Sequence, residues 1–266
     1  RKLAPTLNRI SAERILVELT KLLLSPNPDY LRIAYDTGVT NVFFPEWDRV
    51  METPQNHPHH CYSVGEHILH SLKEVPPDKV LRFAMLFHDI AKPVTMKTDN
   101  EGITHFHGHA QAGEQMSRAI LKRFRMDKHT INQVSRLVLY HDYINGIEPD
   151  SKIVRRAVYK IGEDIFPSLF VVSRADIMAQ SDYMRKEKLA NVKAWEDCYQ
   201  EVQKAEACIS LKNLAISGKD LMEAGIPAGK KLGSILDSLL LEVLENPDKN
   251  TREYLLSKAL KTASEP

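Results

Sequence analysis

The 266-residue sequence predicts an all-α protein, a helical bundle flanked by further helical segments. Two observations support this fold class. Glycine supplies only 11 residues, below its usual share of about 7%. Apolar residues also recur at helical spacing, while long runs lack the alternation typical of strands. The longest apolar run, Ile235 to Leu244, contains Asp237, Ser238 and Glu242, so we expect no membrane-spanning helix and a protein that is not bound to a membrane.

The cysteine content and the charge limit which cellular environment and which binding partners fit the chain. Cys61, Cys198 and Cys208 form no CxxC pair, which favours a reducing cytoplasm over a disulfide framework. The formal net charge of +1 is too small for nucleic-acid binding through bulk electrostatics. A local basic patch remains, because six basic residues and one acidic residue lie between Arg118 and Arg136. This patch is interpreted either as a solvated helix face or as a surface that faces phosphates.

Short segments rich in proline or asparagine divide the chain into three stretches, residues 1–56, 57–186 and 187–266. In the first stretch, "NRISAERILVELTKLLLSPNP" predicts a helix that Ser11 caps and the following prolines stop. A second short helix, "PDYLRIAYDTG", ends at Gly38, and "FFPEW" is interpreted as a turn packed by aromatic rings. In the last stretch, "SGKDLMEAGIPAGKKLGSILDSLLLEVLENP" predicts a capped helix, a turn and a second helix that ends at a proline.

All eleven histidines lie between His57 and His141, and this clustering indicates a site. The stretch "HCYSVGEHILHSLKEV" predicts an amphipathic helix with His67 beside its apolar face. The stretch "DKVLRFAMLFHDIAKP" is apolar nearly all round, which is typical of a buried helix. It carries His88 and Asp89 near its end, and we expect Pro93 to terminate it.

Further polar groups accompany apolar helical segments later in the chain. The stretch "HFHGHAQAGEQM" brings His105, His107 and His109 to the entrance of a helix. The stretch "SRLVLYHDYI" presents His141 with Asp142 after an apolar run, and "LFVVSRADIMAQSD" contains Asp176. Five separate places in the chain thus each direct a polar group toward the interior.

Burying these groups without partners would be costly, and a divalent metal ion would compensate the carboxylates. Imidazole and carboxylate suit Mn, Fe, Ni or Zn, and Mg where water fills most positions. Lys92 follows His88 by four residues, so we expect its ammonium near the ion, where an anionic substrate oxygen could sit. The alternative is that each histidine is a hydrogen-bonded core residue and that Asp176 pairs with Arg174 or another cation. On either interpretation His57, His59 and His60 are loop residues, and His70 and His129 are surface residues.

The pattern of His67, His88, Asp89 and Asp176 resembles the HD superfamily of metal-dependent phosphohydrolases. This resemblance implies an all-helical core with these four residues as the primary metal ligands. It also implies that His109 and His141 match positions that complete a second metal site in many members, and that Lys92 is the family's frequent lysine.

A narrower resemblance covers the chain from about Asn8 to about Leu260. The motifs "NRISAERILVEL", "FFPEW", "QNHPHHCYSVGEHIL", "LFHDIAKP", "HFHGHAQAG" and the tail segment quoted above resemble bacterial class II CCA-adding tRNA nucleotidyltransferases with an embedded HD domain. The resemblance implies neck and body helices in 1–56, an HD domain in 57–186 and a tRNA-binding tail in 187–266. It implies tRNA, bound through shape and phosphates, as partner. The candidate RNA contacts are Arg118, Lys122, Arg123, Arg125, Lys219, Lys230 and Lys231.

One departure limits the implied activity. Members of that family add nucleotides with a head domain that carries a Gly-Ser motif followed by paired Asp-x-Asp carboxylates. Here the Gly-Ser of "LGSILDS" has no Asp-x-Asp after it. We therefore expect this polypeptide, which begins at Arg1, not to add CCA by itself, and to be either the headless part of a longer enzyme or a natural relative without the head.

Three hypotheses for function follow. The first is a metal-dependent phosphohydrolase acting on phosphomonoesters or cyclic phosphodiesters, including those at RNA 3′ ends, with Asp89 as a ligand and with Lys92, and His109 or His141, stabilising charge on the phosphate. The second is a tRNA-binding module whose HD core is structural or inactive. The third is a hydrolase of small phosphorylated nucleotides that has no connection with RNA.

Overall fold

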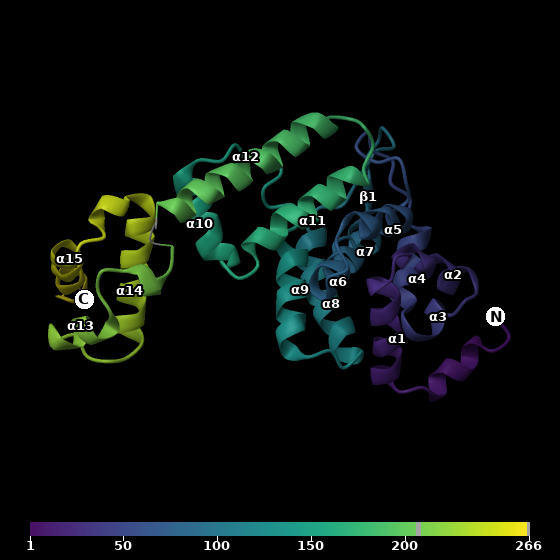
Figure 1. Ribbon diagram of the computed structural model, residues 1–266, viewed down its shortest axis with the longest axis horizontal. Helices are drawn as coiled ribbons and strands as arrows, with labels where there is room; N and C mark the ends of the chain where they lie inside the picture. Colours follow the sequence, from purple (N-terminus) through teal and green to yellow (C-terminus); the bar gives the residue numbers. More distant parts are fainter. Residues whose placement is uncertain (206–208, 265–266) are drawn as a thin grey trace. The chain divides into compact units, whose positions relative to one another are not determined.

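The computed structural model describes residues 1–205 and 209–264 (Figure 1). It is predominantly helical, which confirms the all-α prediction. The strands found among the described residues are β1 (Lys97–Thr98) and β2 (Thr104–His105), which pair antiparallel. Cys61 and Cys198 are free thiols, and Cys208 lies outside the described residues.

The chain folds into two compact units. The first comprises Arg1–Ile147 with Ile165–Val192, and the second comprises Glu148–Asp164 with Lys193–Pro266. The helices of the first unit are α1 (Ala12–Leu24), α2 (Leu31–Asp36), α3 (Thr40–Phe43), α4 (Pro45–Glu52), α5 (Val64–Glu74), α6 (Lys79–Phe87), α7 (Lys92–Thr95), α8 (His109–Arg123), α9 (Lys128–Tyr140) and α11 (Phe166–Met178), with 3-10 helices at Ala4–Arg9 and Pro28–Tyr30.

The second unit contains α10 (Ser151–Ile161), α13 (Gly218–Glu223), α14 (Lys230–Glu245) and α15 (Arg252–Ser264), with 3-10 helices at Leu211–Asn213 and Pro247–Lys249. The long helix α12 (Arg185–Lys204) begins in the first unit and ends in the second. No helix of the described residues is both long enough and apolar enough to cross a bilayer.

The N-terminal helices follow the sequence prediction except at the aromatic segment. Helix α1 begins after Ser11 and ends at Leu24, before the prolines; Ser11 occupies the N-cap position, but its side chain makes no capping hydrogen bond. The predicted turn at "FFPEW" is wrong except at one residue. Phe44 alone joins α3 to α4, and α4 begins at Pro45. Proline is favoured at the first position of a helix, where its missing N–H is not needed. The aromatic packing is confirmed, since Phe44 and Trp47 are fully buried with ring centroids 6.2 Å apart.

Helices α5 and α6 form the centre of the first unit. The Ser63 and Asp78 side chains accept hydrogen bonds from backbone N–H groups in the first turns of α5 and α6. Every residue from Leu81 to Phe87 of α6 is buried, as expected for a helix that is apolar all round. The expectation that Pro93 ends this helix is wrong. Helix α6 ends at Phe87, and Pro93 lies in the first turn of α7.

A small β-hairpin, which sequence analysis did not predict, precedes α8. The Asp99 carboxylate accepts hydrogen bonds from two backbone N–H groups of the turn, and Gly102 adopts φ +80° there. Thr104 and Asn56 exchange two hydrogen bonds, of 2.8 and 2.9 Å, which join the hairpin to the segment before α5. His105 therefore lies on β2 and not at the entrance of α8.

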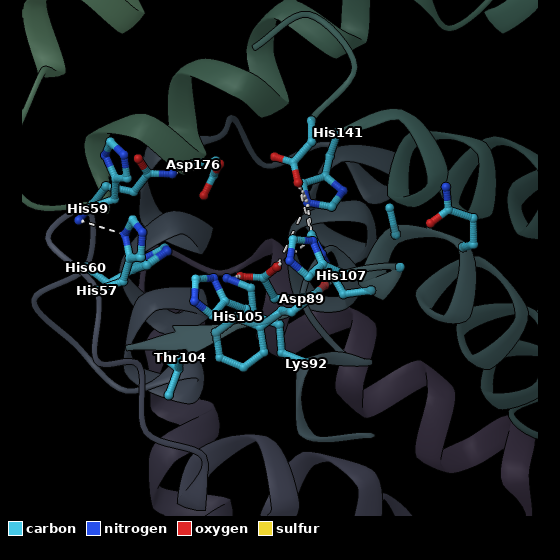
Figure 2. Close-up of a pocket in the computed structure, with 17 residues that line it drawn as sticks. His57, His59, His60, Asp89, Lys92, Thr104, His105, His107, His141 and Asp176 are labelled. Carbon is cyan, nitrogen blue, oxygen red and sulfur yellow. Dashed lines mark hydrogen bonds and ion pairs between the residues drawn. The ribbon is translucent and has the colours of Figure 1, made fainter. Parts of the chain in front are cut away.

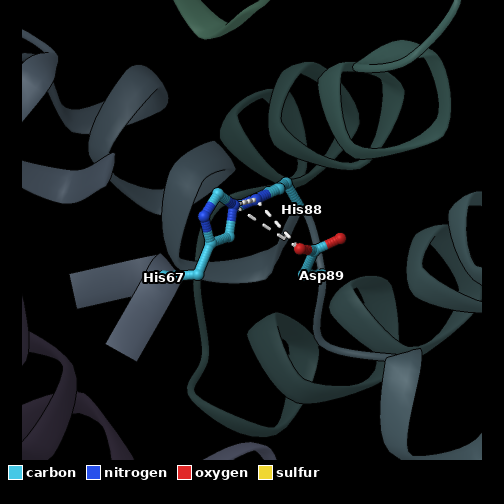
Figure 3. A group of neighbouring side chains, drawn as sticks. All are labelled: His67, His88 and Asp89. Atoms are coloured by element: carbon cyan, nitrogen blue, oxygen red, sulfur yellow. Dashed lines mark hydrogen bonds and ion pairs between the residues drawn. The ribbon is translucent and has the colours of Figure 1, made fainter. Parts of the chain in front are cut away.

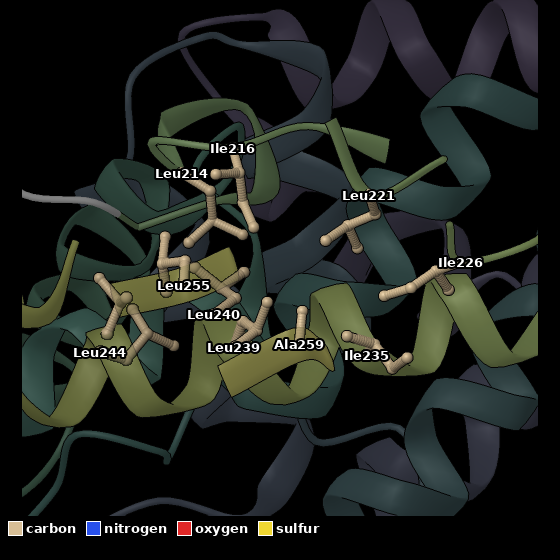
Figure 4. Close-up of a cluster of buried hydrophobic side chains, with 11 residues drawn as sticks. Leu214, Ile216, Leu221, Ile226, Ile235, Leu239, Leu240, Leu244, Leu255 and Ala259 are labelled. Atoms are coloured by element: carbon tan, nitrogen blue, oxygen red, sulfur yellow. The ribbon is translucent and has the colours of Figure 1, made fainter. Parts of the chain in front are cut away.

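The second unit has its own apolar core (Figure 4). Leu239, Leu240 and Leu244 of α14 pack with Leu255 of α15 and with residues of the preceding segment. Ser217 forms a capping box at the start of α13, which confirms the predicted capped helix, turn and second helix of this segment.

Gly65 lies at the contact of α4 with α5, two residues before His67. A Cβ atom added at Gly65 would lie 2.6 Å from the Met51 Cα atom and 3.0 Å from its nitrogen. These are backbone atoms, which move only with the helix. Glycine at this position therefore lets α5, with His67, approach α4 closely.

We expect Gly65→Ala to lower the free energy of unfolding by about 1–3 kcal/mol, the usual cost of overpacking. Gly233→Ala in α14 is the control, because an added Cβ there meets no atom within 4 Å. Removing that glycine should raise helix stability by up to about 1 kcal/mol. Thermal and urea unfolding followed by circular dichroism measures both, and equal effects of the two variants would contradict the packing argument.

Candidate metal centre

Four of the predicted ligands converge at one point of the first unit. Figure 3 shows three of them, His67, His88 and Asp89. The His67 Nε2 atom lies 2.8 Å from Asp176 Oδ1 and 3.1 Å from His88 Nε2. Asp89 Oδ2 lies 3.3 Å from His88 Nε2 and 3.7 Å from His67 Nε2. All four residues are at most 5% exposed. We call His67, His88, Asp89 and Asp176 the first cluster.

A second cluster uses the other oxygen of the same aspartate. Asp89 Oδ1 lies 3.5 Å from His109 Nε2 and 3.9 Å from His141 Nε2. The Asp142 Oδ2 atom lies 3.2 Å from the Nε2 atoms of both histidines. We call His109, His141, Asp89 and Asp142 the second cluster. Asp89 thus lies between two imidazole pairs, with one carboxylate oxygen toward each.

Backbone carbonyl groups fix the orientation of the four imidazole rings. In each ring the Nδ1 atom lies within hydrogen-bond distance of a carbonyl oxygen: His67 with Ala179, His88 with Met85, His109 with Phe106 and His141 with Val138, at 3.2, 2.8, 2.9 and 2.7 Å. A carbonyl oxygen only accepts, so Nδ1 carries a proton in each ring. Each neutral ring then presents the Nε2 lone pair, the donor that a metal ion needs.

The Nε2 atoms approach one another in pairs. His67 and His88 are 3.1 Å apart at these atoms, and so are His109 and His141. Two unprotonated nitrogens at this distance repel, because neither carries a hydrogen to donate. Each pair therefore requires a cation, either a proton on one ring or a metal ion held by both. The donor set fits a divalent metal ion.

The charges of the centre lead to the same requirement. With neutral imidazoles, the net charge of the centre is −2, because three carboxylates (Asp89, Asp142 and Asp176) stand against the one Lys92 ammonium. Burial opposes ionisation of Asp89, but the charges of Lys92 and His88 outweigh it and hold the pKa of that carboxyl well below its usual range. Burial likewise disfavours a charged His88, yet Asp89 and Asp176 raise the pKa of His88 to about 10. The anionic centre thus attracts cations.

Lys92 is held at the centre by contacts on two sides. Its Nζ atom lies 2.7 Å from Asp89 Oδ2 and donates a hydrogen bond of 2.7 Å to Gln55 Oε1. The ammonium also lies 5.1 Å from the centre of the Phe106 ring. Although α6 ends before His88, Lys92 still reaches the site, as the sequence spacing predicts.

The centre lies at one side of a cavity of about 390 Å³ (Figure 2). Histidines from the loop before α5, from β2 and from the turn after β2 line its wall: His57, His59, His60, His105 and His107. His70 and His129 are exposed, as expected. This volume lies within the range of about 300–1,000 Å³ that is usual for small-molecule sites.

Sequence analysis did not assign Asp142 or Gln180 to the site. Asp142 follows His141 just as Asp89 follows His88, and each histidine is the C-cap of an apolar helix. This repeated His-Asp pair was the signal that could have identified Asp142. Gln180 donates a hydrogen bond of 3.0 Å to Asp176 Oδ2, and no sequence signal indicated this contact.

The predicted RNA contacts are distributed over both units. Arg118 and Arg123 each bind a side chain of their own unit. Arg123 makes two hydrogen bonds of 2.7 Å to Glu46. Lys122 and Arg125 are exposed at the end of α8. Lys219, Lys230 and Lys231 lie around the α13–α14 turn of the second unit, where Lys231 also donates to the Ala263 carbonyl oxygen.

The fold and the site define a helical protein with a buried histidine-aspartate centre suited to divalent ions. Residues 94–259 match the family described as tRNA nucleotidyltransferase domain 2 (putative), and residues 1–51 match the family described as probable RNA and SrmB-binding site of polymerase A. Since the first match covers more than half of the chain, the protein belongs to the tRNA nucleotidyltransferase family.

Two curated relatives agree with this family. The chain is 31% identical to the CC-adding tRNA nucleotidyltransferase of Thermus thermophilus over 239 residues, 86% of this chain and 52% of the relative. It is 29% identical to the multifunctional CCA protein of Pasteurella multocida over 204 residues, 69% of this chain and 48% of the relative. The chain spans about half the length of these relatives.

We expect Asp89→Asn to reduce metal binding at both clusters, because Asp89 faces both. Asp176→Asn and Asp142→Asn should each weaken one cluster and retain the other. The metal content of each variant is measured after dialysis against Mn²⁺, with the thermal shift as a second readout. A ligand present at about 100 times its Kd raises the free energy of unfolding by about 2.7 kcal/mol.

Asp99→Asn is the matched control, because Asp99 pairs with His105 at 2.7 Å on the hairpin and outside both clusters. It should bind metal like the unchanged protein. Full metal content in Asp89→Asn would show that the two clusters do not share this carboxylate as a ligand.

Proposed function

We propose that this protein is a metal-dependent phosphohydrolase of the HD type, acting on phosphomonoesters or cyclic phosphodiesters, including those at RNA 3′ ends. The observation that carries the proposal is the placement of Asp89, with one buried carboxylate oxygen toward each of two imidazole pairs. Such an arrangement suits divalent ions that act together on one phosphate.

The residues of the chain have separate roles in this proposal. His67, His88, Asp89 and Asp176 would hold one ion, and His109, His141, Asp89 and Asp142 a second. A bound divalent ion supplies hydroxide near neutral pH, because it lowers the pKa of a bound water from 15.7 to about 7 in favourable cases. Lys92, fixed by Gln55 and Asp89, would neutralise negative charge that develops on the phosphate oxygens.

The geometry changes the roles that the sequence suggested for His109 and His141. Their Nε2 atoms face each other and two carboxylates, which supports a role as ligands more than a role as free donors to the phosphate. Lys92 is then the cationic side chain of the centre that carries no ligand atom.

We expect the protein with Mn²⁺ to hydrolyse a 2′,3′-cyclic nucleotide, and Asp89→Asn to lower kcat/KM by at least about a thousandfold, since it removes a group shared by both clusters. Lys92→Met should lower kcat while metal content is retained. Phosphate release and product chromatography measure both variants, with Asp99→Asn as control. Undiminished hydrolysis by Asp89→Asn would refute the proposal.

The second candidate function is tRNA binding by the helical segments outside the centre. It is favoured by the match of residues 1–51 to an RNA-binding family and by the exposed basic side chains of α8 and of the α13–α14 turn. The relatives are named for CC or CCA addition. For this protein we propose nucleotide addition only together with a head domain, because its 266 residues contain no Asp-x-Asp motif.

We expect Lys219→Ala combined with Lys230→Ala to weaken tRNA binding and to reduce the salt slope by about 1 to 2, because each phosphate contact contributes somewhat less than one unit. Lys186→Ala combined with Lys193→Ala removes the same charge from α12 as a control. Filter binding across a salt series measures both. No binding of tRNA even at low salt would contradict this function.

A further inference from the structure

One segment of the first unit lies against the metal centre without helix or strand. It comprises residues 53–63, between α4 and α5, and we call it the strap. The Val64 backbone N–H donates a hydrogen bond of 2.9 Å to the Thr53 carbonyl oxygen, which closes the two ends of the strap on each other. None of the functions above uses the strap. Its histidines line the cavity of the centre and are labelled in Figure 2: His57, His59 and His60.

The two clusters of the centre differ in their access to this cavity. His109 and Asp142 of the second cluster line the cavity, and their side chains are 15% and 44% exposed. Among the described residues that line the cavity, the first cluster contributes its two carboxylates but neither imidazole. His67 and His88 are each 1% exposed. The second cluster is therefore open to the cavity, whereas the imidazoles of the first cluster lie behind the cavity wall.

The strap covers the first cluster with one of its rings. The His60 ring lies edge to face with the His67 ring, with 5.6 Å between the two centroids. The His60 Nδ1 atom is buried and has no hydrogen-bond partner among the described residues. The position of this ring beside the first cluster therefore depends on where the strap lies.

Hydrogen bonds tie the strap to the rest of the first unit on two sides. After α11, the Ser181 hydroxyl donates to the Pro58 carbonyl oxygen at 2.6 Å, and the Ser181 N–H donates to the His59 carbonyl oxygen at 3.0 Å. On the hairpin, Thr104 Oγ1 accepts from the Asn56 N–H at 2.8 Å. The strap thus bridges the hairpin and the turn that follows α11.

Lifting the strap would expose little apolar surface. Residues 54–63 are all described, and none of them is buried. Segments with few buried apolar contacts open locally at a lower free energy than the helices of a core. The hydrogen bonds to Ser181 and Thr104 therefore account for much of the cost of moving the strap, and His60 with it, away from the first cluster.

We propose that the strap is a gate for metal exchange at the first cluster. An ion at the second cluster exchanges through the cavity and does not need this gate. The inference rests on the metal centre of the proposed function, but it requires neither hydrolysis nor a particular substrate. It implies one slowly exchanging and one rapidly exchanging ion in the same protein.

The test follows the release of Zn²⁺ from the loaded protein into an excess of a chromogenic chelator by stopped flow. We expect a fast and a slow phase, each corresponding to one ion. Asp142→Asn weakens the second cluster and should remove the fast phase. Asp176→Asn weakens the first cluster and should remove the slow phase. These two variants assign each phase to its cluster.

Ser181→Ala removes the hydroxyl tether and should accelerate the slow phase by about two- to tenfold, the usual effect of one lost hydrogen bond on an opening equilibrium. The loading of the first cluster should accelerate by the same factor. The fast phase and the equilibrium Kd for Zn²⁺ should not change, because no ligand atom is altered. Thr104→Val loosens the opposite side and gives a second test if Ser181→Ala fails to fold.

Ser264→Ala is the matched control. The exposed Ser264 hydroxyl donates a hydrogen bond of 2.7 Å to the Lys261 carbonyl oxygen in the second unit, so the same chemical change is made away from the strap. It should leave both phases of Zn²⁺ release unchanged.

Release in a single phase, or a slow phase that neither Ser181→Ala nor Thr104→Val accelerates, would overturn the gate. Acceleration of both phases with a weaker Zn²⁺ affinity would also overturn it, because that pattern indicates a general loosening of the centre. The failure of the hydrolase is a separate result. Gated release by a protein that hydrolyses no phosphate ester retains the gate, and hydrolysis by a protein with one release phase retains the hydrolase alone.

Discussion

The burial of the Asp89 carboxylate between two pairs of imidazoles is the constraint on which the rest of the first unit depends. A carboxylate that is 2% exposed is stable only with cations close to both oxygens. Lys92 supplies one positive charge at 2.7 Å. The imidazole pairs supply the remaining sites for cations, since each pair brings two Nε2 atoms to 3.1 Å. Helices α5, α6, α8, α9 and α11 must therefore meet at one point, and the apolar faces around that point give the energy that holds them there.

The same local arrangement of residues, which we call the device, occurs twice in the centre. An apolar helix ends at the residue before a histidine, the histidine Nδ1 bonds the carbonyl oxygen three residues earlier, and an aspartate follows. This device occurs at His88 with Asp89 and at His141 with Asp142. A histidine from another helix joins each cluster, His67 in the first and His109 in the second, while Asp176 also belongs to the first cluster and Asp89 to both. The geometry of a helix end thus orients the ring and the carboxylate together, without a dedicated loop.

The second unit contributes a separate apolar core and exposed lysines. The candidate centre and the lysines of the second unit can therefore be varied independently. Arg123 shows why charge alone does not identify an RNA contact. Its guanidinium is already bound by both oxygens of Glu46, which ties α8 to α4. A basic residue in a sequence can stabilise its own fold as well as bind a phosphate.

The sequence by itself determined the helical class and most helix ends, because periodicity and capping are local signals. It also predicted the family and the four residues of the first cluster, through motifs that resemble those of known families and not through local spacing. It misplaced the end of α6 and the turn at Phe44, since a proline stops a helix in some contexts and starts one in others. Only the tertiary structure decided that Asp89 faces both clusters, that Asp142 belongs to the second and that Gln180 donates a hydrogen bond to Asp176. These facts depend on which side chains from distant segments meet, and no local pattern of residues encodes such a meeting.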